Sequence, residues 1–147
     1  MNTAVSLQAS RASAASSVDA YPAFEKNNGF RLLVKRDDVI GGSHARKVAW
    51  LFPDAIARGA RRLLTFGGVG SNYLVTLGRA CVDYRLQLEA IVLDQPPTEW
   101  VQQNLLRMHR VGVNLHHAAS FPRAGWTFLR LRSAFARTDG VPPYCLR

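Results

Sequence analysis

The sequence has few cysteines, no metal-binding pattern and no long apolar run. Its two cysteines, Cys81 and Cys145, lie far apart and outside any C-x-x-C spacing, which argues against a disulfide scaffold or a zinc site and favours a reducing cytoplasm. The four histidines show neither H-x-x-x-H nor H-E-x-x-H spacing, so no metal site is predicted. Arg, Asp or Gly interrupts every apolar run before the ~20 residues that a transmembrane helix needs. We therefore exclude a membrane-spanning protein and expect a cytoplasmic location.

Acidic residues and lysines are also scarce, and arginine dominates the charge. The chain has 19 Lys and Arg against 10 Asp and Glu, which gives a formal net charge of +9. After Glu99 there are seven arginines and a single acid, Asp139. Such a balance leaves open a basic module that binds nucleic acid through its phosphate backbone. Because no aromatic or helix-turn-helix signature accompanies the arginines, we expect them instead to form a face that meets another part of the fold.

The first residues do not belong to a core. Residues 1–22 are rich in Ser and Ala, with hardly a large apolar side chain and without the apolar region of a secretory signal. We predict a disordered tail over 1–22. The remaining residues, 23–147, can bury one domain core, because 48% of the 147 residues are hydrophobic.

Beyond the tail, the hydrophobic pattern switches repeatedly between the strand period and the helix period. Ser71 and Thr98 are well placed to cap helices, and Gly59 and Gly112 are stop signals. Pro53 lies inside a helical pattern and is expected to kink or split that helix. The alternation predicts an α/β fold with an open, mostly parallel sheet and helices on both faces. The expected strands span 30–35, 62–66, 86–93 and 113–116, and the expected helices span 45–57, 72–84, 99–111 and 126–136.

The turn at 67–70 is where we expect a ligand. In an open parallel sheet, ligands bind beyond the carboxyl ends of the strands, often against a helix N-terminus. The glycines of this turn allow close approach of the backbone, and the following helix offers N–H groups to an anion. A purely structural tight turn remains the alternative.

One functional interpretation of this turn is a dinucleotide-binding oxidoreductase domain. Gly68 and Gly70 follow a strand and open a helix, and Asp94 ends the next strand at the place of a ribose-binding acid. Tyr73 occupies the third glycine position of that pattern, where its ring would obstruct the close approach of helix and strand. This interpretation stays open as an alternative function.

A second interpretation rests on three motifs that occur in order: K-R-D-D at 35–38, G-G-S-H-A-R-K at 41–47 and G-G-V-G-S-N at 67–72. Together they resemble the 1-aminocyclopropane-1-carboxylate deaminase / D-cysteine desulfhydrase family, whose members read K-R-D-D, G-G-N-K-x-R-K and G-G-V-Q-S-N. Two later stretches, N-L-L at 104–106 and P-Y-C-L at 143–146, also look familial. The resemblance covers about 30–147 and implies a pyridoxal-phosphate-dependent fold of the tryptophan synthase β type (fold type II).

The resemblance places the chemistry of the family on a histidine. The lysine of G-G-N-K carries pyridoxal phosphate as an imine, and His44 stands at that position. Imidazole has no primary amine, so His44 can serve as a base but cannot hold the cofactor covalently. Lys47, about one helical turn away, is the nearby amine. We expect no rescue by Lys47, because small misplacements already cost much rate.

The resemblance also assigns binding roles at the glycine turn. It implies that Asn72 binds the 3-hydroxyl of the cofactor, and that Ser71 with nearby N–H groups binds the substrate carboxylate. Gly70 stands where the family has Gln, and Tyr73 stands where it has His or Gln, so the contacts to substrate are expected to differ.

Family members are much longer than this chain. The resemblance implies that the part after P-Y-x-x-P supplies the phosphate cradle, so we expect 23–147 to be the N-terminal portion of such an enzyme, with its C-terminal portion absent. The predicted function is that of a catalytically impaired relative of deaminases or desulfhydrases of small amino acids. We expect self-association, or a separate C-terminal half, as its partner.

Overall fold

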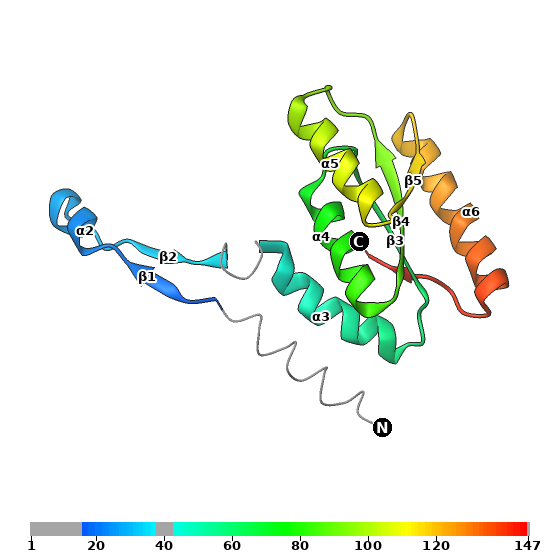
Figure 1. The fold of residues 1–147 in the computed structure, drawn as a ribbon, viewed down its shortest axis with the longest axis horizontal. Coiled ribbons are helices and arrows are strands. Elements are labelled where there is room, and N and C mark those ends of the chain that lie inside the picture. Colours follow the sequence, from blue (N-terminus) through cyan, green and yellow to red (C-terminus); the bar gives the residue numbers. More distant parts are fainter. Residues whose placement is uncertain (1–15, 38–42, 147) are drawn as a thin grey trace. The chain divides into compact units, whose positions relative to one another are not determined.

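The structure, a computed structural model, describes residues 16–37 and 43–146. The chain forms two compact units, Met1–Pro53 and Asp54–Arg147, each with a sheet of its own (Figure 1). Three motif residues, Asp38, Gly41 and Gly42, lie outside the described residues, as do 1–15 of the expected tail.

The first unit contains a small antiparallel hairpin. Strand β1 (Val18–Ala20) pairs with β2 (Leu33–Lys35), and helix α2 (Pro22–Asn28) lies between them in sequence. An ion pair of 2.6 Å joins Asp19, in the middle of β1, to Arg36, the residue after β2. Residues 18–20 of the expected tail thus form a strand, and only the end of the strand expected at 30–35 is extended.

Helix α3 (Ser43–Ala57) follows, and it continues through Pro53. Of the two outcomes predicted for Pro53, a kink or a split, the split is therefore wrong. The proline lacks only its own N–H group, and the turn after it is closed by bonds from Arg58 N to Asp54 O at 3.1 Å and from Ala60 N to Ala55 O at 3.0 Å. Gly59 adopts a φ of 70° and ends the helix, as expected.

The second unit is built on a parallel sheet with the strand order β5-β4-β3-β6. Helices α4 and α5 lie on one side of this sheet and α6 on the other (Figure 1). This arrangement confirms the predicted α/β fold with helices on both faces. The elements are β3 (Arg62–Gly68), α4 (Asn72–Tyr84), β4 (Gln87–Leu93), α5 (Glu99–Arg110), β5 (Asn114–His117), α6 (Phe121–Asp139) and β6 (Tyr144–Cys145).

Two elements of the second unit differ by two residues or more from the predicted bounds. Strand β3 continues through Gly67 and Gly68, so the turn itself is shorter than expected. Helix α6 begins at Phe121, five residues before the predicted start, because Ser120 caps it and Pro122 suits its first turn.

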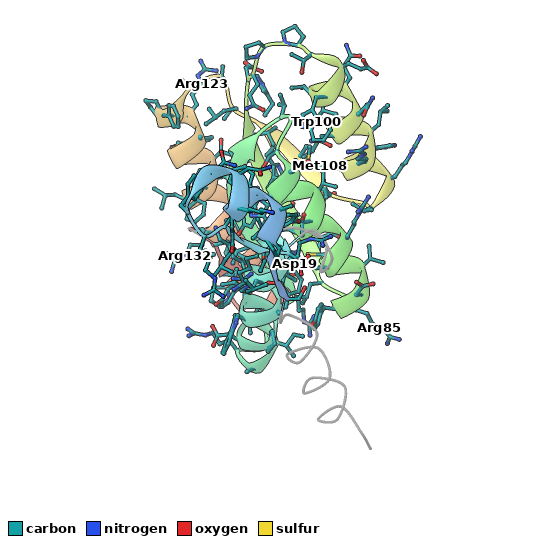
Figure 2. All side chains as sticks on the ribbon, turned by 90° about the vertical axis from the view of Figure 1, so that its left-hand side faces the viewer. Asp19, Arg85, Trp100, Met108, Arg123 and Arg132 are labelled. Atoms are coloured by element: carbon teal, nitrogen blue, oxygen red, sulfur yellow. The ribbon has the colours of Figure 1, made fainter. Side chains whose placement is uncertain are left out.

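Alternation along the strands divides the apolar residues between the two faces of the sheet. The α6 face carries a cluster formed by Leu64, Ile91, Ala118, Ala124 and Leu131. On the other side, α5 shows two faces of its own, marked in Figure 2 by the fully buried Met108 and the exposed Trp100.

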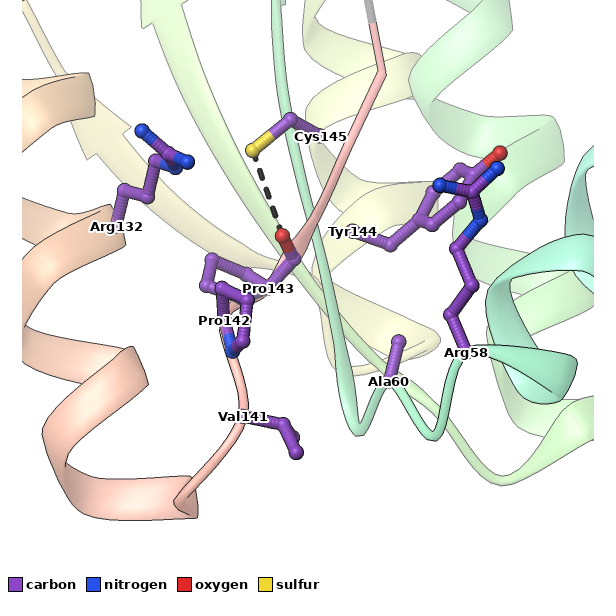
Figure 3. A pocket seen from close by; sticks show the side chains of 8 residues that line it. All are labelled: Arg58, Ala60, Arg132, Val141, Pro142, Pro143, Tyr144 and Cys145. Carbon is purple, nitrogen blue, oxygen red and sulfur yellow. Dashed lines mark hydrogen bonds between the residues drawn. The ribbon is translucent and has the colours of Figure 1, made fainter.

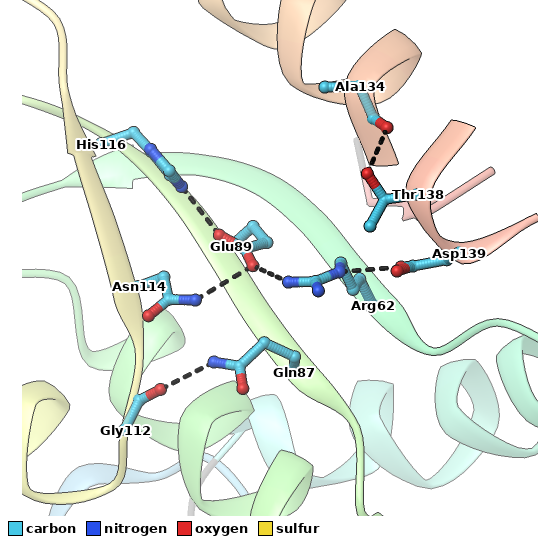
Figure 4. A network of polar contacts seen from close by, with 9 residues as sticks. All are labelled: Arg62, Gln87, Glu89, Gly112, Asn114, His116, Ala134, Thr138 and Asp139. Atoms are coloured by element: carbon cyan, nitrogen blue, oxygen red, sulfur yellow. Dashed lines mark hydrogen bonds and ion pairs between the residues drawn. The ribbon is translucent and has the colours of Figure 1, made fainter. Parts of the chain in front are cut away.

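A buried carboxylate lies on the α6 face of the sheet. Glu89 of β4 accepts hydrogen bonds from Arg62 Nη1 at 2.6 Å and from Asn114 Nδ2 at 3.0 Å, and it contacts His116 Nε2 at 2.7 Å (Figure 4). Arg62 also donates to Asp139 of α6 at 2.8 Å, and this bond contributes most to holding the pKa of Arg62 above its ordinary value. The network links three strands to α6. It also gives the buried carboxylate of Glu89 the hydrogen-bond and ion-pair partners that a buried charge needs.

Candidate functional site

The glycine turn joins β3 to α4 in the second unit. Ser71 caps α4 in extended conformation, and its Oγ accepts from Leu74 N at 3.4 Å, as the sequence predicted. Ser71, Asn72 and Tyr73 are consecutive in the sequence, and the structure places all three at the N-terminus of α4.

Other side chains approach the glycines of the turn closely, and the exposed amide of Gln95 can move away from Gly68 more readily than Val101 of α5 can from Gly70. A Cβ on Gly68 would lie 2.4 Å from the side-chain amide carbon of Gln95, and a Cβ on Gly70 would lie 2.6 Å from Val101 Cγ2. A side chain such as the family's Gln does not fit at position 70 in this arrangement. Gln95 and the first turn of α5 therefore occupy the space beside the turn.

Several N–H groups of the turn already have partners within the chain. Gly70 N donates to Gln95 Oε1 at 2.8 Å, Ser71 N to Gly68 O at 3.0 Å and Val69 N to Leu93 O at 3.1 Å. An anion that binds at Gly70 must displace the amide of Gln95, which is exposed.

The side chain of Asn72 accepts a hydrogen bond from a buried amide, that of Asn104. Asn104, which is fully buried, donates through Nδ2 to Gly70 O at 2.8 Å and to Asn72 Oδ1 at 3.0 Å. Arg107 donates to Asn104 Oδ1 at 3.0 Å, and its guanidinium lies 5.6 Å from the centre of the Trp100 ring. A chain of contacts thus runs along one face of α5 to the first residue of α4.

The residues of the dinucleotide interpretation have other neighbours. Tyr73 is half-buried, and burial raises the pKa of its hydroxyl above the ordinary value. Asp94 follows β4 and contacts His117 Nε2 at 2.9 Å, with both side chains largely exposed. The carboxylate at the expected ribose position is therefore engaged by an imidazole of the same chain.

His44 and Lys47 lie together on α3, in the first unit. His44 is half-buried, with its Nδ1 atom inside, whereas Lys47 is exposed. Two other motif residues, Asp37 and Arg46, form an ion pair in the same unit. These residues belong to a different unit from the glycine turn.

Two cavities lie elsewhere in the second unit. The larger, of about 360 Å³, surrounds β6, where Tyr144 and Cys145 point to opposite sides (Figure 3). Tyr144 donates to Asp54 at 2.6 Å there. The smaller, of about 280 Å³, follows β5. The larger is lined by Arg58, Ala60, Arg132, Val141, Pro142, Pro143, Tyr144 and Cys145, and the smaller by His117, Ala118, Ala119, Arg123, Trp126 and Thr127.

Over the residues that the structure describes, no group of three or more His, Cys, Asp and Glu side chains is placed to hold a metal ion. Within the same part of the chain, no helix is long and apolar enough to cross a membrane.

Comparison with known proteins places the fold. No family model matches the chain. An ACC deaminase homologue matches with a TM-score of 0.72 and 23% identity, over 89% of this chain and 41% of the solved chain. A pyridoxal 5'-phosphate-dependent aspartate racemase matches with a TM-score of 0.63 and 16% identity, over 97% of this chain and 45% of the solved chain. The chain has the fold of type II pyridoxal-phosphate enzymes, as predicted, and it spans less than half the length of both solved chains.

Proposed function

We propose that this chain is a relative of the pyridoxal-phosphate-dependent deaminases and desulfhydrases of small amino acids, and that it lacks their imine-forming step. The fold and the three ordered motifs support the relationship. One observation carries the lost step: His44 stands where the motif has the cofactor lysine.

The chemistry of His44 does not fit a covalently held cofactor. An imine forms when a primary amine adds to an aldehyde and its nitrogen gives up two hydrogens as water leaves. A neutral imidazole carries one N–H, so the side chain of His44 cannot complete this exchange. Its Nδ1 is buried on α3, so the ring is packed against the protein.

Lys47 does not replace the missing amine in this proposal. It lies three residues after His44, about 4.5 Å along the helix axis and on a neighbouring face. His44 is half-buried and Lys47 is exposed, so the two side chains have different surroundings. An amine displaced by several ångströms loses most of the benefit of a positioned nucleophile.

The substrate class in this proposal is a small amino acid, such as 1-aminocyclopropane-1-carboxylate or D-cysteine. Its carboxylate would meet Ser71 and the amide of Asn72 at the first turn of α4, where the helix dipole favours negative charge. Gly70 N donates to Gln95 Oε1 at 2.8 Å, so a carboxylate that reaches Gly70 N must displace Gln95. The chain would then bind an amino acid without converting it.

Turnover tests this proposal. The purified chain is incubated with pyridoxal phosphate and D-cysteine, and the formation of pyruvate, sulfide and ammonia is measured before and after exhaustive dialysis. We expect no turnover above that of the cofactor alone. The variant His44→Lys, which restores the amine, tests whether position 44 is responsible. Pyruvate formation by the dialysed wild type would overturn the proposal.

A further inference from the structure

We infer that Asn104 is a positioning residue that fixes the amide of Asn72 with its Nδ2 turned away from α5. The first turn of α4 thereby presents only donors at this side chain and selects an oxygen acceptor, such as a carboxylate. This inference rests on the proposed function for the identity of the ligand, but the orientation itself follows from the contacts of Asn104.

The orientation of Asn104 is determined by chemistry on both of its sides. Gly70 O is a carbonyl and can only accept, so the atom of Asn104 at 2.8 Å must be the donor Nδ2. The guanidinium of Arg107 can only donate, so the atom that it meets at 3.0 Å must be Oδ1. A flipped amide would set acceptor against acceptor and donor against donor.

The same constraint passes to Asn72. One hydrogen of Asn104 Nδ2 goes to Gly70 O, and the other goes to Asn72 at 3.0 Å, so the facing atom must be the acceptor Oδ1. The Nδ2 of Asn72 then lies on the far side of its planar amide, directed away from Asn104. Asn72 is exposed, whereas Asn104 is fully buried, so one face of the amide is held by the protein and the other is turned outward.

Packing on α5 keeps Asn104 in this position. Trp100, Asn104 and Arg107 are separated by four and three residues and therefore share one helix face. The Trp100 ring lies 5.6 Å from the guanidinium of Arg107, which restricts the donor that orients Asn104. Burial of Asn104 makes an unsatisfied alternative costly, so the arrangement is well determined.

The variant Asn104→Asp tests the inference. An aspartate keeps the shape of the side chain and the contact with Arg107, but it replaces the donor that faces both Asn72 and the Gly70 carbonyl by an acceptor. We expect the Asn72 amide to flip and donate inward, so that its oxygen faces outward. Amide hydrogen exchange and the side-chain ¹⁵N–¹H resonances of Asn72 report this flip, which a merely structural role of Asn104 would not produce.

Ligand binding gives the second measurement. Titration with 1-aminocyclopropane-1-carboxylate is expected to shift the Asn72 side-chain resonances of the wild type, and Asn104→Asp is expected to weaken this binding by about tenfold or more, as for a lost charge-assisted hydrogen bond. Asn72→Asp keeps the acceptor for Asn104 and should abolish binding. Gln102→Glu, which adds the same charge at an exposed position of α5, is the matched control and should bind as the wild type does.

The two possible failures are distinguishable. Unchanged Asn72 resonances in Asn104→Asp overturn the inference, whatever the affinity. A flipped amide in a chain that binds no amino acid supports the positioning role and overturns the proposed substrate class instead.

Discussion

Arg62 is the cation of the buried network beneath α6, and its removal is expected to destabilise the second unit strongly. Its Nη1 lies 2.6 Å from Glu89 Oε1, and the Glu89 side chain is only 2% exposed. The substitution Arg62→Met keeps much of the apolar stem but leaves the carboxylates of Glu89 and Asp139 without this cation. Charges of this kind are not rehydrated without opening the fold.

The expected cost follows from what remains around Glu89. Removing one partner of a buried ion pair costs about 3–5 kcal/mol. Asn114 and His116 still contact the carboxylate at 3.0 and 2.7 Å, so the lower end, about 3 kcal/mol, is expected. Adding Glu89→Leu removes the buried charge as well. The double variant should therefore cost about 2 kcal/mol less than the sum of the two single variants.

Urea unfolding, followed by circular dichroism and tryptophan fluorescence, measures these differences. The control is Arg58→Met, because the Arg58–Asp54 pair has side chains that are 70% and 44% exposed. Such an exposed pair contributes less than about 1 kcal/mol. The reasoning is refuted if Arg62→Met costs no more than Arg58→Met, or if the cycle between Arg62 and Glu89 is additive.

Three further predictions concern single positions. Gly70→Ala should destabilise the chain by about 1–3 kcal/mol, because the new Cβ would meet the first turn of α5. Gly125→Ala lies in open space on helix α6 and should stabilise the chain by about 0.5–1 kcal/mol. Thermal unfolding of the two variants measures this difference in sign. Burial raises the pKa of the Cys81 thiol to about 12, so iodoacetamide should leave it unmodified in the native chain near neutral pH and alkylate it after unfolding; native alkylation would show that Cys81 is accessible. The hydrogen bond from Tyr144 lowers the pKa of Asp54, so this bond stabilises the fold above about pH 4 and the stabilisation disappears as the pH falls through the lowered pKa. Tyr144→Phe should therefore reduce the loss of stability at acid pH that urea unfolding measures. An unchanged pH dependence would contradict the assignment.

Much of the second unit could be predicted because its signals are local. The apolar segment of β3 ends before Gly67, that of β4 is separated from the Pro-Pro pair at 96–97 by two residues, and Ser71 caps α4 through its own side chain. Strand β6 was not predicted, because two residues after a Pro-Pro pair show no period. Strand β1 is also not predicted, because its three residues, V-D-A, are too few to show an alternating pattern and continue a Ser- and Ala-rich segment.

The site was less predictable because its contacts come from distant segments. Ser71, Asn72 and Tyr73 were found from one motif, but Gln95 lies 25 residues beyond the Gly70 that it contacts. Asn104 lies 34 residues beyond Gly70, and the N-L-L stretch marked it as familial without indicating what its amide contacts. Such pairings depend on how α5 packs against α4, which no local pattern records.

Borohydride trapping tests the lost imine most directly. The chain is incubated with pyridoxal phosphate, reduced and mapped by mass spectrometry, with Lys26 and Lys35 as internal references for surface labelling. We expect Lys47 to be labelled no more than these two lysines, and His44→Lys to gain a reduced adduct at position 44. A stoichiometric adduct on Lys47 of the wild type, removed by Lys47→Ala, would contradict the central claim that no lysine of this chain holds the cofactor as a site-specific imine.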